Sequence, residues 1–260
     1  MSNGTLQIER DGPIGYVVLS NPARRNAIGA EMWRAFPSVI ASLNDDPAIR
    51  CIVLRGAGDV AFAAGADISE FESKRANDDG VARYEALTRA AHGALESSPK
   101  PVIAQIQGYC IGGGLAIALS CDLRYCADDS QFAIPAARLG LGYGVAGHRR
   151  LVATVGQANA REIMFSARRY DAASAHALGL VNRVVPRAEL TTYVHSLAQD
   201  LAANAPLTQA ASKAAINALI DHGGDFSACE QLIARCMHSA DYIEGRTAFM
   251  QKRKPRFSGR

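Results

Sequence analysis

Two short stretches built on one plan constrain this chain more than any other feature: each is an apolar run that ends in small residues and leads into a predicted helix. The first is AFAAGADISE at residues 61–70, and the second is KPVIAQIQGYCIGGGLAIALSCD at residues 100–122. Small residues leave the backbone N–H groups of such turns uncovered. Two turns of this kind can point two amides at one acceptor, which is the layout of a two-donor oxyanion hole.

The hydrophobic pattern between and around these stretches predicts an α/β fold with a helical C-terminal region. Strands are predicted at residues 6–10, 15–20, 51–56, 102–106, 122–127 and 180–185. Helices are predicted at residues 30–43, 81–95, 148–154, 157–165, 172–177, 188–203, 207–220, 226–238 and 241–251, with one more directly after Gly113. The turn residues Pro206 and Gly223-Gly224 fall in the helical tail.

Charge and cysteine usage narrow the class of protein. The 28 basic and 25 acidic residues leave a net charge of only +3, which is far from the basic footprint of a nucleic-acid binder. The six cysteines lie in apolar runs without the spacing of a zinc site, as expected of reduced thiols. Neither a signal core nor a run of bilayer length is present. These features predict a cytoplasmic protein with no nucleic-acid or membrane partner.

Taken together, the GAD and GYCIGGG motifs resemble those of the enoyl-CoA hydratase/isomerase, or crotonase, superfamily, and the resemblance covers nearly the whole chain. It implies a spiral of strand-strand-helix turns over residues 1–201 and a helical trimerisation region over residues 202–260. It also implies that the N–H groups of Ala66 and Gly113 bind the thioester oxygen of an acyl-CoA. No cofactor beyond the CoA moiety is expected. The implied assembly is a homotrimer or a dimer of trimers.

The resemblance further suggests which residues bind the CoA ester. Those expected to line its path are Arg25, Ala27, Ala64, Asp67, Ile68, Ser69, Tyr109, Gly112, Pro135 and Ala136, with Phe249 and Lys252 approaching the adenine from a neighbouring subunit. Simpler interpretations stand beside two of these. Asp67 is placed to cap a helix N-terminus. Lys252 begins a basic run that can simply be solvated.

The chain departs from the family where hydratases place two glutamates, which hold the attacking water and deliver the proton. Ala116 stands at the first of these positions and Ala136 at the second, and neither can move a proton. Nearby, FAIPAARLGLGYGVAG resembles the matching segment of methylmalonyl-CoA decarboxylases, which also carry a tyrosine there. Those enzymes differ in having a histidine at position 66 and a glutamate at position 116. Tyr143 is therefore a candidate proton donor, although a tyrosine that anchors a glycine-rich turn would look the same.

Other interpretations remain open at this point. A CoA-thioester binding protein without catalytic activity would also keep the amide donors and lose both glutamates. Residues 142–147 spell the G-x-G-x-x-G dinucleotide fingerprint, but no buried strand is predicted directly before them, so the match is taken as coincidence. His148 fits a structural role. The carboxylates Glu70, Glu72, Glu85 and Glu96 would supply a base only if they faced the acyl pocket, and solvated positions are the simpler interpretation.

Overall fold

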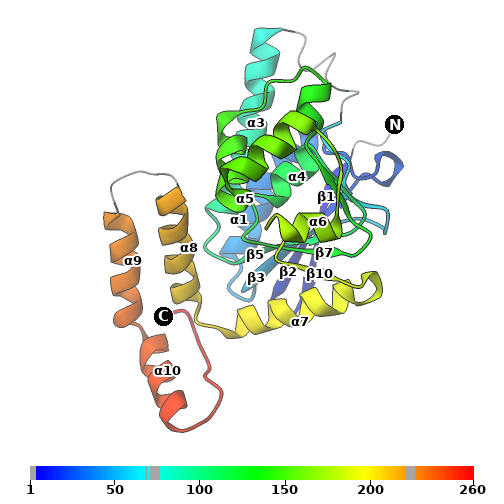
Figure 1. The fold of residues 1–260 in the computed structure, drawn as a ribbon. Helices are drawn as coiled ribbons and strands as arrows, with labels where there is room; N and C mark the ends of the chain where they lie inside the picture. The colour runs from blue at the N-terminus through cyan, green and yellow to red at the C-terminus, as the bar shows by residue number, and fades with distance from the viewer. Residues whose placement is uncertain (1–3, 68–69, 71–76, 221–225) are drawn as a thin grey trace.

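The computed structural model arranges the chain around two β-sheets with helices on both sides (Figure 1). It describes residues 4–67, 70, 77–220 and 226–260. The larger sheet has the strand order β1-β2-β3-β5-β7-β10, and only β1 and β2 pair antiparallel. Its strands are β1 (Thr5–Asp11), β2 (Ile14–Ser20), β3 (Cys51–Gly56), β5 (Val102–Ile106), β7 (Leu123–Ala127) and β10 (Arg183–Val185). Each predicted strand is present, with small differences at the ends.

The smaller sheet has the order β4-β6-β8-β9, in which β8 and β9 pair antiparallel. Its strands are β4 (Ala61–Ala63), β6 (Tyr109–Ile111), β8 (Gln131–Ala133) and β9 (Tyr170–Asp171). The sequence pattern predicts none of these strands, because two or three residues are too few for an alternation to register. The chain visits the large sheet, then the small sheet, then a helix, which gives the expected strand-strand-helix turns.

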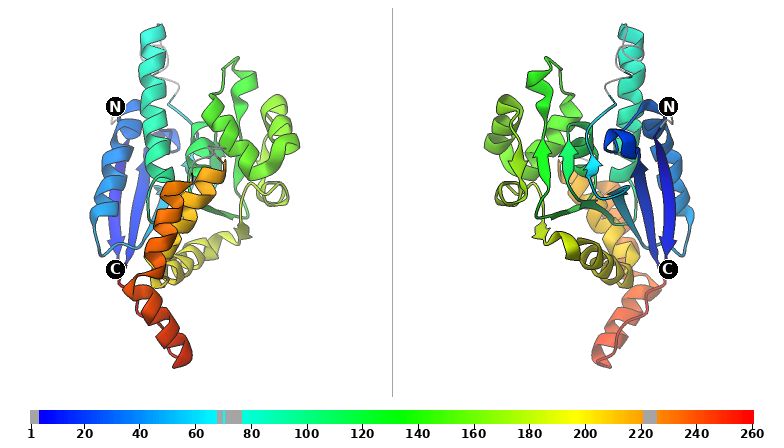
Figure 2. Two further views of the ribbon diagram at one scale, coloured as in Figure 1. Left: turned by 90° about the vertical axis from the view of Figure 1, so that its left-hand side faces the viewer. Right: turned by 90° about the vertical axis from the view of Figure 1, so that its right-hand side faces the viewer.

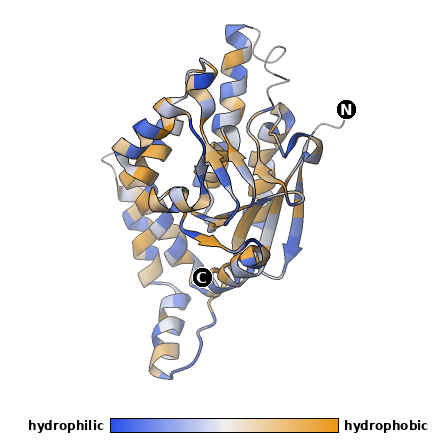
Figure 3. Cartoon of the chain, turned by 45° about the vertical axis from the view of Figure 1, so that its right-hand side comes forward, coloured by the Kyte–Doolittle hydropathy of each residue, from blue (hydrophilic) through white to orange (hydrophobic). Residues whose placement is uncertain are grey.

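Helices cover both faces of the large sheet, as its continuous apolar strands require. On one face, α1 (Ala30–Asp45) packs against α3 (Asp78–Glu96) and buries Trp33 and Phe36 in the main core. On the other face, α7 (Leu190–Ala203) buries Val194 against the strands. The two helix layers enclose the hydrophobic strands seen in Figure 3. The described helices include none that is both long and apolar enough to cross a membrane.

The segment between β8 and β9 contains the two predicted helices. They make up α5 (Val145–Ser166), which begins slightly before the predicted start and is interrupted between the two helices where Gly156 adopts a φ of +75°. Residues with a side chain rarely adopt this backbone conformation, which explains why a glycine stands at the break. The element before the G-x-G-x-x-G match at residues 142–147 is the 3-10 helix η3 (Pro135–Arg138) and not a buried strand. The G-x-G-x-x-G match therefore lacks the context of a dinucleotide site. The helix α6 (Ala172–Ala177) follows as predicted.

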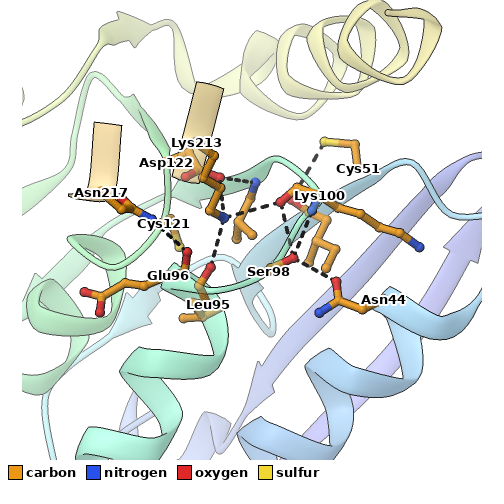
Figure 4. Close-up of polar contacts among 12 residues, drawn as sticks. Asn44, Cys51, Leu95, Glu96, Ser98, Lys100, Cys121, Asp122, Lys213 and Asn217 are labelled. Carbon is orange, nitrogen blue, oxygen red and sulfur yellow. Dashed lines mark hydrogen bonds and ion pairs between the residues drawn. The ribbon is translucent and has the colours of Figure 1, made fainter. Parts of the chain in front are cut away.

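The last three helices extend away from the sheets (Figure 2). They are α8 (Pro206–Ile220), α9 (Ser227–Met237) and α10 (Ala240–Met250), close to the predicted bounds; the predicted Gly223-Gly224 turn lies outside the described residues. Figure 4 shows how α8 is fixed to the core: Lys213 Nζ donates to Asp122 Oδ2 at 2.9 Å and to the Leu95 carbonyl at 2.9 Å. Asn217 Nδ2 donates to the Glu96 carbonyl at 2.9 Å.

Candidate active site

The two sequence motifs come together at their backbones. Ile28 N–H donates to the Gly65 carbonyl at 2.8 Å, and Asp67 N–H donates to the Ile28 carbonyl at 3.0 Å, so Ala66 lies between two ladder bonds. The N–H of a residue in this position faces away from the ladder. A Cβ built on Gly113 would lie 3.0 Å from the Ala66 nitrogen. Within the described part of the chain, neither amide donates a hydrogen bond to another residue.

Close packing of α4 (Gly113–Ala118) on β4 explains part of the glycine triplet. A Cβ on Gly114 would overlap the carbonyl oxygen of Ala63 and lie 2.8 Å from the Ala63 side chain. Both obstacles belong to a buried strand and cannot swing aside. Glycine at this position therefore lets the helix start directly against the strand, which brings the Gly113 amide beside Ala66.

Trp33 lies beside this amide pair and is bonded to Tyr84, and the sequence patterns single out neither residue. Trp33 Cζ2 would be 3.4 Å from a Cβ on Gly113, and the same edge of the indole donates from Nε1 to the Tyr84 hydroxyl at 3.0 Å. Both side chains are almost completely buried. In the sequence, both residues have the spacing of ordinary core residues in a helix. Only the contact of Trp33 with Gly113 in the folded chain places this pair near the site.

A buried histidine and serine lie below Ala116. Nδ1 of His92 is 2.8 Å from Ser120 Oγ, and this hydroxyl donates to the Ala116 carbonyl at 3.3 Å. The His92 ring centroid is also 5.6 Å from that of Trp33. Burial, aided by the positive charge of Arg150, lowers the pKa of His92 to about 3. The imidazole is therefore neutral at physiological pH and cannot act there as a general acid.

Tyr143 has the properties expected of a neutral acid. Its hydroxyl is buried and has no hydrogen-bond partner among the described residues. Burial raises the pKa of Tyr143 to about 12, although the positive charge of Arg150 acts in the opposite direction. The ring packs against the main core and meets His148 edge-on, with ring centroids 5.2 Å apart. The contact with His148 also fits the anchoring role that the sequence left open.

Three of the four glutamates considered as unconventional bases are described, and each is either bonded to another residue or exposed to solvent. Glu96 pairs with Arg150, and Glu70 Oε2 accepts from the Ala30 N–H at 2.7 Å at the start of α1. Glu85 is exposed to solvent, and Glu72 lies outside the described residues. Ala136 is buried and Ala116 is half-buried.

Several residues predicted to line the CoA path make contacts with one another or with strands of the small sheet. Arg25 accepts from the Ala64 N–H at 2.9 Å through its carbonyl, and its guanidinium lies over the Tyr109 ring. Ala27 is buried two residues further along. The Gly112 N–H donates to Ala133 at 2.8 Å, and Pro135 Cδ would be 3.8 Å from a Cβ on Gly112.

The remaining predicted contacts are placed differently. Asp67 forms an ion pair with Arg24, which the sequence pattern does not predict. Its Oδ1 and Oδ2 atoms lie 2.6 and 2.5 Å from Nη1 of Arg24. The helix that Asp67 was expected to cap, like Ile68 and Ser69, lies outside the described residues. Phe249 and Lys252 are exposed at the end of α10, which Figure 1 places far from α4. Their approach to a neighbouring subunit stays a prediction.

Comparison with known proteins gives a consistent result. The family model described as enoyl-CoA hydratase/isomerase matches residues 9–260. The short-chain-enoyl-CoA hydratase of Clostridium acetobutylicum is 33% identical over 256 residues, covering 98% of this chain and 97% of the relative. The peroxisomal Delta(3,5)-Delta(2,4)-dienoyl-CoA isomerase of Arabidopsis thaliana is 33% identical over 272 residues, with 98% and 97% covered.

Solved structures agree with this similarity. The crystal structure of an enoyl-CoA hydratase/carnithine racemase from Magnetospirillum magneticum superposes with a TM-score of 0.95 and 37% identity. The match covers 100% of this chain and 97% of the other. The α/β spiral predicted from the sequence motifs is therefore confirmed.

Proposed function

Because the chain belongs to the enoyl-CoA hydratase/isomerase family, we propose that it acts on an acyl-CoA thioester through an enolate whose oxygen is bound by the N–H groups of Ala66 and Gly113. The observation that carries the proposal is the proximity of these two backbones together with the absence of another acceptor for either amide among the described residues. Losing one such donor costs roughly 3 to 4 kcal/mol of transition-state stabilisation in other enzymes. The pair can therefore supply a large part of the rate enhancement without any side chain.

The surroundings of the amide pair favour a lyase-type reaction. Alanine at positions 116 and 136 removes both groups that hydratases of the family use, so any hydration would have to be atypical. Decarboxylation of a malonyl-type thioester needs no base. The bond between Cα and the carboxylate carbon breaks, CO₂ leaves, and the electron pair forms the enolate held by the amides. A proton delivered to Cα then restores the thioester.

Tyr143 is the proposed proton donor in either reaction. Its raised pKa keeps the phenol protonated at neutral pH, and its buried hydroxyl has no competing partner among the described residues. After transferring its proton to Cα, the phenolate would regain one from water. A general acid of this kind typically contributes 10²- to 10⁴-fold.

A second candidate is a CoA-thioester binding protein of the same fold that has no turnover. The observation that favours it is the replacement of both carboxylate positions by alanine while the amide pair is kept. Binding needs the backbone donors and the CoA path, and neither depends on the missing glutamates.

Incubating the purified protein with a panel of enoyl-CoA and malonyl-type thioesters separates the two candidates. We expect turnover of at least one member, with Tyr143→Phe lowering that rate by about 10². His148→Ala is the matched control, because it removes the ring that touches Tyr143 while keeping the hydroxyl. Equal, near-native rates for both variants would remove Tyr143 from the mechanism. Tight binding without turnover across the panel would instead support the inert binder.

Assembly through the C-terminal helices completes the proposal. Large apolar side chains are exposed along α8–α10, including Leu219, Ile243 and Phe249. A second copy of this chain would cover them, in a homotrimer or a dimer of trimers, and would bring Phe249 and Lys252 toward a neighbouring CoA. The cysteines carry no disulfide, which supports the proposed cytoplasmic location.

A further inference from the structure

Two arginines from distant parts of the chain lie over one tyrosine ring. The guanidinium carbon of Arg25 is 5.1 Å from the ring centroid of Tyr109, and that of Arg169 is 5.7 Å from the same centroid. The small sheet explains the meeting. The Arg25 carbonyl is bonded to the chain directly after β4, Tyr109 begins the neighbouring strand β6, and Arg169 directly precedes β9.

Among the residues that the structure describes, neither arginine has an acidic partner. Within the described part of the chain, no carboxylate oxygen lies within 4.0 Å of Arg25 or Arg169, and both side chains belong to exposed residues. The adjacent Arg168 offers a contrast: its guanidinium lies 4.7 Å from the Tyr170 centroid, but it also pairs with Glu162. Two positive groups gathered on one ring repel each other, and an anion placed between them would relieve that repulsion.

We propose that Arg169, together with Arg25, binds a phosphate group of the CoA thioester, and that Tyr109 holds the two guanidinium groups in place. This inference rests on the proposed function. Tyr109 stands at the start of β6, and the chain reaches Gly113 four residues later, so the arginine pair and the amide pair are separated by at most about 14 Å of backbone.

This separation suits the ligand. The thioester and the phosphates of an acyl-CoA lie at opposite ends of the flexible pantetheine arm, so they need two separate contact points. Guanidinium groups bind phosphate through parallel hydrogen bonds, and stacking on an aromatic ring pre-orients them for that geometry. The sequence pattern gives no sign of this role for Arg169, because the residue follows Arg168 in a loop and matches no motif.

Calorimetric binding of free coenzyme A tests the inference. We expect Arg169→Gln to weaken binding about ten-fold and Arg168→Gln to change it less than two-fold. Arg169→Lys should fall between wild type and Arg169→Gln, because it keeps the charge and loses the planar fork. Pantetheine, which lacks every phosphate, should bind wild type and Arg169→Gln equally.

The source of the phosphate is decided by repeating the titration with dephospho-CoA. If the effect of Arg169→Gln disappears, the group is the 3′-phosphate; if it persists, the group is the diphosphate. A wild type that binds coenzyme A and an Arg169→Gln variant that binds it equally well would overturn this inference and leave the proposed function intact. A wild type that does not bind coenzyme A would overturn both.

Discussion

Replacing the buried His92 should change how the stability of the protein depends on pH. The side chain is only 8% exposed, and its pKa is lowered to about 3, so the folded protein keeps the imidazole neutral. The unfolded chain takes up a proton below a pKa of about 6.5. The contribution of the neutral His92 to the free energy of unfolding is therefore fully present above pH 6.5 and is lost as the pH falls toward 3. Between pH 7.5 and 4.5 this linkage amounts to about 2.5 kcal/mol of unfolding free energy.

The measurement is urea unfolding of wild type and His92→Gln at several pH values in that interval. The other titrating groups contribute to both proteins, so the difference between the two free energies isolates His92. Wild type should lose about 2.5 kcal/mol relative to the variant on going from pH 7.5 to 4.5. His176→Gln, at an exposed position in α6, controls for the loss of an imidazole as such. A difference that stays constant with pH would refute a buried neutral imidazole beside Ser120.

Two further pairs of substitutions test the packing of α4 on β4 and the attachment of α8 to the core. Gly114→Ala should lower the free energy of unfolding by about 2 kcal/mol or more, because the added methyl meets the Ala63 backbone, and it should also lower turnover or CoA-ester binding. The control is Gly93→Ala, where a Cβ meets nothing within 4 Å. It should instead stabilise α3 by about 0.5–1 kcal/mol in the same unfolding assay. Lys213→Met should lower the free energy of unfolding by about 3 kcal/mol, because it leaves the Asp122 carboxylate without its ammonium partner. Asp122→Asn should lower it little further in that background. Strictly additive losses in the double-mutant cycle would contradict a coupled pair.

The large sheet and most helices were predictable because their residues carry strong local signals. The strand over residues 102–106 is a buried apolar run of ordinary length, and the helix from Ala30 has an apolar face long enough to show its period. The four strands of the small sheet have no such signal. A strand like Ala61–Ala63 is defined by its pairing with β6, which is a contact between residues far apart in the sequence.

The same distinction separates the parts of the site that were predicted from those that were missed. Ala66 and Gly113 lie in motifs whose small residues stand out, so their meeting was expected. Trp33, Tyr84 and His92 come from helices whose apolar spacing indicates only a core. The contacts of Trp33 with Gly113 and of His92 with Ser120 depend on how α1 and α3 pack, and no local pattern of a single sequence encodes that packing.

The chemistry of the site follows from which of its parts depend on side chains. Backbone amides at positions 66 and 113 survive almost any substitution that keeps the local conformation, whereas proton transfer at positions 116 and 136 needs a particular side chain and has none. The two side chains whose pKa values Arg150 influences, His92 and Tyr143, are a neutral imidazole and a protonated phenol. Neither group is a base at neutral pH, which agrees with the proposal that the protein stabilises a negative charge on the substrate instead of removing a proton from it. A reaction that generates its own enolate, such as the loss of CO₂, matches that balance better than the addition of water.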